Sequence, residues 1–231
     1  MEHKVIWIHG TFDCPSATDG TGKMGRSHNR LTLLELTETQ NNANNLKDNP
    51  DSRRVQALKD LVNDPAAEIW GFEWSGIADE EARKLGGQNL VEHLRMTGFH
   101  EPNYKVSVAT HSHGGNVLGH AMSSSNLKIT ACYLFACPFF GTGTGNWRVS
   151  PNARKRVKTK YSFMHPTDRI QVIGAGVVGG GVTFSTCDDF DNYSINPTGG
   201  GGYGIGDISH TSMSRSRAFD MARKVLNSNP K

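Results

Sequence analysis

The chain has 231 residues, of which 36% are hydrophobic, and a formal net charge of +3 at pH 7. This length corresponds to about one domain with one large core, and so small a charge gives no argument for nucleic-acid binding. No apolar run approaches the roughly 18 residues that a membrane-spanning helix needs. We therefore expect a single domain over residues 1–231, with no integral membrane segment and no nucleic-acid partner.

The first predicted strand is the apolar run at residues 4–8, which leads into His9-Gly10-Thr11-Phe12. Residues 13–50 and 138–156 are predicted loops, and both are candidate lid insertions. The opening residues lack a charged segment followed by an apolar stretch, so no secretory signal is expected. The expected location is cytoplasmic by default, with signal-independent export as the open alternative.

Predicted strands and helices alternate through the rest of the chain. Strands are predicted at 69–74, 104–110, 129–136, 157–164 and 182–187. Helices are predicted at 52–61, 78–94, 113–122 and 211–226. This alternation predicts an α/β fold, a mostly parallel central sheet with helices on both faces. Functional sites of such sheets lie at the carboxyl ends of the strands.

The pentapeptide Thr110-His111-Ser112-His113-Gly114 connects a predicted strand to a predicted helix. A small residue on either side of x-Ser-x at such a turn is the pattern of a nucleophile elbow. The strained turn exposes the serine hydroxyl, and small neighbours are needed because strand and helix approach closely. Gly114 and Gly115 supply them on the helix side, whereas Thr110 stands where glycine is most common. The pattern predicts Ser112 as a nucleophile.

Two later loops supply partners for such a serine, which needs an adjacent base to react at neutral pH. His210 precedes the last predicted helix and is the expected general base and acid. Asp168 follows the strand at 157–164 and is the expected carboxylate that orients His210. Other acids remain open as alternatives: Asp207, Asp188, Asp189 and Asp191. His9, His111 and His113 are expected to be loop and packing residues.

These segments resemble the α/β-hydrolase superfamily, in particular small bacterial lipase-like and esterase-like members. The likeness rests on His9-Gly10-Thr11, on Phe72-Glu73-Trp74-Ser75-Gly76 and on the elbow at residues 111–116, and it spans residues 4–226. It implies the α/β-hydrolase fold, with hydrolysis of carboxylic esters by a Ser-His-Asp triad through an acyl-enzyme. Lipid or phospholipid acyl esters are the leading substrate class that it implies.

The turn after the first strand is the expected second half of an oxyanion hole. The backbone N–H groups of Thr11, or alternatively Phe12, and of His113 would face the developing oxyanion. No cofactor or metal is expected. The run at 174–181 matches the dinucleotide-binding pattern G-x-G-x-x-G, but no strand is predicted before it and no helix after it. The segment Thr110-His111-Ser112-His113 resembles the start of a metal-hydrolase motif, but the further metal ligands of that motif are missing.

Cysteines and basic residues add two further expectations. Cys132 and Cys137 lie in one apolar run and are expected to be buried thiols. A basic cluster is expected to be a solvated loop, or alternatively a transient contact with an anionic membrane surface; it comprises Arg148, Arg154, Lys155, Arg156, Lys158 and Lys160. The oligomeric state is not predicted. A non-catalytic protein of the same fold, which binds a ligand or partner, is the alternative function.

Overall fold

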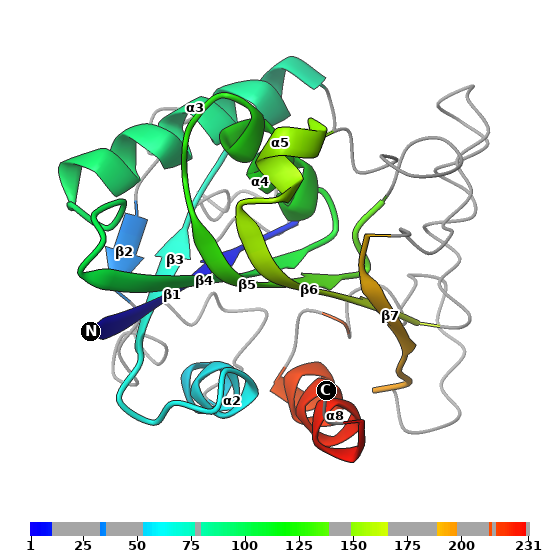
Figure 1. The fold of residues 1–231 in the computed structure, drawn as a ribbon. Helices are drawn as coiled ribbons and strands as arrows, with labels where there is room; N and C mark the ends of the chain where they lie inside the picture. Colours follow the sequence, from blue (N-terminus) through cyan, green and yellow to red (C-terminus); the bar gives the residue numbers. More distant parts are fainter. Residues whose placement is uncertain are drawn as a thin grey trace, which may run out of the picture.

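The computed structural model describes residues 1–10, 33–35, 53–76, 80–138, 149–165, 189–197, 213 and 216–229. Seven strands form one sheet in the order β2-β3-β1-β4-β5-β6-β7 (Figure 1). Their bounds are β1 Glu2–Ile8, β2 Leu33–Glu35, β3 Glu68–Phe72, β4 Tyr104–His111, β5 Ile129–Phe135, β6 Val157–Met164 and β7 Asp191–Ser194. Every neighbouring pair is parallel except β2 and β3, which are antiparallel.

Helices cover both faces of this sheet. They are α2 Arg54–Leu61, α3 Glu80–Met96, α4 Gly114–Ser123, α5 Pro151–Arg154 and α8 Ser216–Ser228. Figure 1 shows α3, α4 and α5 on one face and α2 and α8 on the other. The predicted fold class, a mostly parallel α/β sheet with helices on both faces, is therefore confirmed.

Strand β1 shows why the central strands read as continuous apolar runs. Ile6 and Ile8 are fully buried in the cluster that includes the apolar side chains of α3 and α4. Val5 and Trp7 are buried in the second cluster, which includes those of α2 and α8. A strand covered on both faces has no polar side, so it loses the alternation of a half-exposed strand.

Most predicted elements agree with the structure to within two residues, and β6 has the predicted bounds 157–164. The loop predictions are wrong at β2 within 13–50 and at α5 within 138–156. No strand was predicted at β7. These three elements are short, and the edge strand β7 reads Asp-Asn-Tyr-Ser, so little apolar pattern marks them. The predicted strand at 182–187 lies outside the described residues.

The last helix starts later than predicted, because Met213 lies in a turn and α8 begins at Ser216. Cys132 and Cys137 are buried thiols, as expected. Within the described residues, no helix is both long and apolar enough to cross a membrane.

The basic cluster is not a single solvated patch. Arg154 pairs with Asp189, and the Arg156 guanidinium donates to the backbone oxygens of Met122, Ser125 and Leu127. Those two arginines therefore tie α5 and β6 to neighbouring parts of the chain. Arg148 lies outside the described residues.

Candidate active site

Ser112 occupies the turn between β4 and α4 in a left-handed backbone conformation, with φ of +50°. Its N–H group donates to the carbonyl oxygen of Phe135 at 2.9 Å, which extends the β4–β5 ladder by one residue. The left-handed region costs a residue with a Cβ atom roughly 1–2 kcal/mol. The turn therefore stores strain at this serine, whose side chain lies at the carboxyl edge of the sheet.

Two glycines let the turn come close to its surroundings. A Cβ atom at Gly114 would lie 2.6 Å from the carbonyl oxygens of both Ile8 and His9. A Cβ atom at Gly115 would lie 2.2 Å from the Cys137 sulfur. The first two residues of α4 thus pack directly against the ends of β1 and β5. This is the physical reason for the small residues after Ser112.

The loop after β1 reaches the serine itself. A Cβ atom at Gly10 would lie 2.9 Å from the Cβ atom of Ser112 and 2.8 Å from Nδ1 of His111. Only a residue without a side chain fits between the two loops in this arrangement. The structure therefore brings together the His-Gly segment and the candidate nucleophile, which are about one hundred residues apart in the sequence.

His9 fixes the position of this loop. Its Nε2 accepts a hydrogen bond from the Trp74 backbone N–H at 3.1 Å, and its Nδ1 lies 2.7 Å from the Gly10 carbonyl oxygen. The Trp74 indole N–H donates to the His9 carbonyl oxygen at 2.9 Å. Since a backbone N–H only donates, Nε2 carries no proton and the imidazole is neutral with its proton on Nδ1. His9 is a positioning residue, as expected.

The sequence showed His9 and Trp74 as parts of separate motifs but gave no sign of this contact. Their rings stack, with centroids 5.8 Å apart and planes inclined by 18°. Trp74 is 1% exposed and follows β3, the neighbour of β1 in the sheet. The Trp-Ser-Gly segment therefore supports the loop that lies against Ser112.

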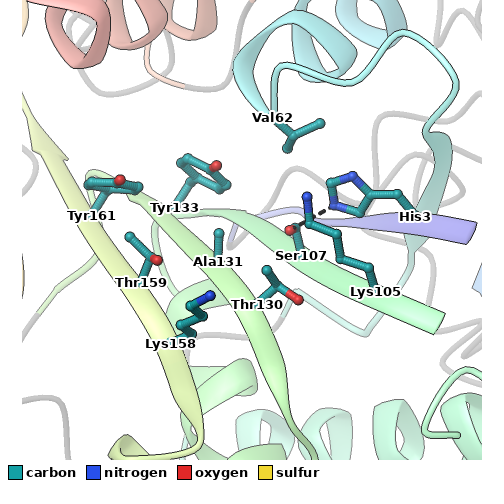
Figure 2. Close-up of a pocket in the computed structure, with 10 residues that line it drawn as sticks. All are labelled: His3, Val62, Lys105, Ser107, Thr130, Ala131, Tyr133, Lys158, Thr159 and Tyr161. Carbon is teal, nitrogen blue, oxygen red and sulfur yellow. Dashed lines mark hydrogen bonds between the residues drawn. The ribbon is translucent and has the colours of Figure 1, made fainter. Parts of the chain in front are cut away.

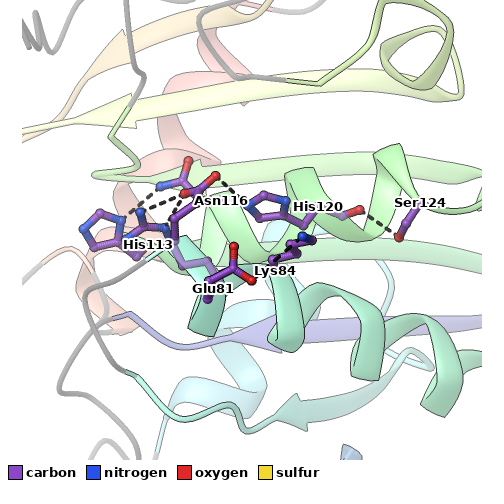
Figure 3. A network of polar contacts seen from close by, with 8 residues as sticks. Glu81, Lys84, His113, Asn116, His120 and Ser124 are labelled. Carbon is purple, nitrogen blue, oxygen red and sulfur yellow. Dashed lines mark hydrogen bonds and ion pairs between the residues drawn. The ribbon is translucent and has the colours of Figure 1, made fainter.

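His113 lies at the N-terminal cap of α4, directly after Ser112. The Asn116 side-chain nitrogen is 3.1 Å from Nδ1 of His113, and the His113 carbonyl accepts from the N–H groups of Asn116 and Val117. Figure 3 shows this pair at the start of α4, with His120 further along the helix. His120 lies 3.3 Å from Glu80 of α3. These contacts hold the start of α4 and its packing against α3.

Another histidine, His165, makes a side-chain contact at the carboxyl edge of the sheet. His165 follows β6, is 5% exposed, and has Nε2 3.0 Å from the side-chain oxygen of Asn196, which follows β7. Because a carbonyl oxygen only accepts, His165 carries a proton on Nε2. The sequence offered no signal for this contact. It joins the residues that follow β6 and β7 at the carboxyl edge of the sheet.

The other predicted site residues lie outside the described residues: Thr11, Phe12, Asp168 and His210, with the alternative acids Asp188 and Asp207. Of the remaining alternatives, Asp189 is paired with Arg154, and Asp191 begins β7. Within the described residues, no group of three His, Cys, Asp or Glu side chains is arranged to hold a metal ion.

No family model and no curated protein matches the chain. Among solved structures, it is similar to an alpha-beta serine hydrolase homologue from Coxiella burnetii, with a TM-score of 0.49 and 12% identity over 99% of this chain and 85% of that chain. It is also similar to carboxyl esterase 2 from the fungus Tuber melanosporum, with a TM-score of 0.45 and 11% identity over 97% and 75%. At TM-scores below 0.5, these likenesses carry no functional inference for this chain.

Proposed function

We propose that this protein is a serine hydrolase of the α/β-hydrolase fold that cleaves carboxylic esters, with Ser112 as the nucleophile. One observation carries the proposal: Ser112 has a φ of +50° at a strand-to-helix turn, and Gly10 of the β1 loop lies against it. Strained non-glycine residues cluster at functional sites, where the strain holds a reactive group in place. Asn63 and Ala136 also have a positive φ, so the proposal rests on the strain together with the contact between Gly10 and this serine.

The oxyanion hole would use the backbone N–H of His113 and that of Thr11, with Phe12 as the alternative. Two features support this assignment. His113 directly follows Ser112 at the N-terminal cap of α4, where the positive end of the helix dipole favours a developing negative charge. Gly10 lies against Ser112, and Thr11 is the next residue along the chain. One oxyanion donor is worth on the order of 3 kcal/mol in the transition state.

The proposed triad is completed by His210 and Asp168. His210 takes the Ser112 proton as Oγ attacks the acyl carbonyl, then gives that proton to the leaving alcohol. Water, deprotonated by His210, attacks the acyl-enzyme, releases the acid and restores Ser112. Asp168 would hold His210 in the correct tautomer.

Sheet geometry supports this acid. Strand β6 lies two strands from β4, which is roughly 10 Å at ordinary strand spacing. Asp168 follows His165 by three residues, a reach of at most about 11 Å. A carboxylate on that segment is therefore within range of a histidine that contacts Ser112. The proposed substrate class is lipid or phospholipid acyl esters.

Hydrolysis of p-nitrophenyl esters of increasing acyl length tests the proposal. Wild type should turn over, and Ser112→Ala should fall to the background rate. Ser162→Ala is the matched control, because Ser162 is a buried serine of β6, 1% exposed, whose hydroxyl has no hydrogen-bond partner among the described residues. A preference for long acyl chains would support lipid substrates, and a preference for acetyl would contradict them. A folded wild type without turnover would favour the non-catalytic alternative.

A further inference from the structure

A pocket lies between the sheet and α2, toward the amino ends of the strands (Figure 2). We call it the amino-edge pocket; it is lined by His3, Val62, Lys105, Ser107, Thr130, Ala131, Tyr133, Lys158, Thr159 and Tyr161. Ser107 precedes Ser112 by five residues on β4, which is roughly 17 Å of extended strand. The amino-edge pocket is therefore separate from the candidate active site.

The register of the strands creates this hollow. Ser107, Ala131 and Thr159 are aligned across β4, β5 and β6, and all three are small. Two residues further along the strands, Tyr133 and Tyr161 stack with ring centroids 5.4 Å apart. A row of small side chains beside a wall of two rings leaves a volume of about 190 Å³. That volume equals roughly six water molecules, which suits a small ion or a headgroup.

Charge in the amino-edge pocket is positive. Lys105 and Lys158 flank it from β4 and β6 (Figure 2). No carboxylate is among the described residues that line it. The nearby Asp64 instead accepts from Nδ1 of His3 at 2.9 Å. Burial raises the pKa of the Tyr133 hydroxyl, so this phenol stays protonated and remains a hydrogen-bond donor.

Ser107, His3 and Asp64 form a hydrogen-bonded chain, with Ser107 Oγ 2.9 Å from Nε2 of His3. Its connectivity is that of a serine protease relay, but Ser107 lies within β4, which is paired with β1 and β5 on either side. The neighbouring amides belong to those ladders, so they are not available as an oxyanion hole. These two hydrogen bonds instead hold His3 in one orientation.

We propose that the amino-edge pocket binds the phosphoryl group of a small ligand. Two lysines and several hydroxyl-bearing residues line a space of suitable size, and these are the donors that a tetrahedral anion with many acceptor oxygens requires. A carboxylate is matched best by the planar fork of arginine, and no arginine is among the described residues that line this pocket. Lysine binds phosphate as a point charge.

Calorimetric titration of the full chain with inorganic phosphate, at constant ionic strength, tests this proposal. The double variant Lys105→Gln/Lys158→Gln should bind phosphate at least about tenfold more weakly than wild type. The matched control is Lys155→Gln/Lys224→Gln, which removes the same charge from two exposed lysines outside the pocket. The control should keep wild-type affinity. Equal weakening in both double variants would overturn the proposal, because it would show a general charge effect.

Imidazole NMR resonances give a second measurement that does not depend on substituting lysine. The His3 resonances should shift during the phosphate titration, since His3 lines the pocket. Glycerol 3-phosphate binding more tightly than free phosphate would assign the site to a phosphate ester, and equal binding would assign it to the free ion. Tighter binding of succinate, or no His3 shift up to about 10 mM phosphate, would overturn the proposal.

Discussion

Gly114→Ala tests the close contact between α4 and the end of β1. The added Cβ atom would lie 2.6 Å from the carbonyl oxygens of Ile8 and His9, whereas such contacts essentially never fall below 3.0 Å. The helix or the strand must therefore move by at least 0.4 Å. Both neighbours are backbone atoms, so no side-chain rotation relieves the clash.

Overpacking of this kind costs about 1–3 kcal/mol, and we expect about 2 kcal/mol after the better helix propensity of alanine is counted. For a chain of this size, that lowers the melting temperature by roughly 4–8 °C. Denaturant unfolding followed by circular dichroism measures the change. The same displacement moves the His113 amide relative to Gly10, so ester turnover should also fall.

Gly86→Ala is the control for this prediction. Gly86 is a buried glycine of α3, and its added Cβ atom would lie 3.3 Å from side-chain atoms of Trp74 and Val117. A contact at 3.3 Å requires these neighbours to move by only a few tenths of an ångström, so the change in unfolding free energy should stay within about 1 kcal/mol. If Gly114→Ala and Gly86→Ala were equally stable, the inferred contact between α4 and β1 would be refuted.

Three further predictions concern Gly115, Ser112 and His3. Gly115→Ala should destabilise the fold, because the atom nearest to the new Cβ would be the Cys137 sulfur at 2.2 Å. Adding Cys137→Ala should recover part of the lost stability. Additive changes in unfolding free energy in the double-mutant cycle would contradict that contact. Ser112→Gly should be more stable than Ser112→Ala by about 1 kcal/mol, since only glycine adopts a φ of +50° without strain; equal urea midpoints would show that the turn is relaxed. Burial lowers the pKa of His3 below 6.5, although the hydrogen bond that His3 donates to Asp64 acts in the opposite direction. The unfolded chain therefore binds a proton first, and stability is lost as pH falls from about 6.5 through the folded pKa. His3→Gln should flatten this pH dependence of the urea midpoint, and an unchanged slope would contradict it.

Local sequence patterns predicted the central sheet well, because β1, β4, β5 and β6 are covered on both faces and read as apolar runs. The edge strands β2 and β7 were not predicted, because an edge strand buries little apolar surface and carries a weak hydrophobic pattern. Glycines after Ser112 were predicted from the close approach of strand and helix, and the distances at Gly114 and Gly115 agree with that reasoning.

Contacts between side chains that are distant in the sequence were not predictable in the same way. His9 with Trp74, His165 with Asn196, and His3 with Ser107 each join residues that lie far apart in the sequence. Hydrophobic periodicity reports which face of an element is buried, but not which loop meets which. The order of the strands in the sheet decides these pairs, and hydrophobic periodicity does not determine that order.

Covalent labelling with a fluorophosphonate probe, followed by peptide mass spectrometry, tests the central claim most directly. The account predicts a single modified serine, Ser112, with labelling lost in Ser112→Ala and retained in Ser162→Ala. Loss in His210→Ala as well would identify the base that activates the serine. Modification of another serine, or no labelling of a folded wild type that also fails to hydrolyse esters, would contradict the account.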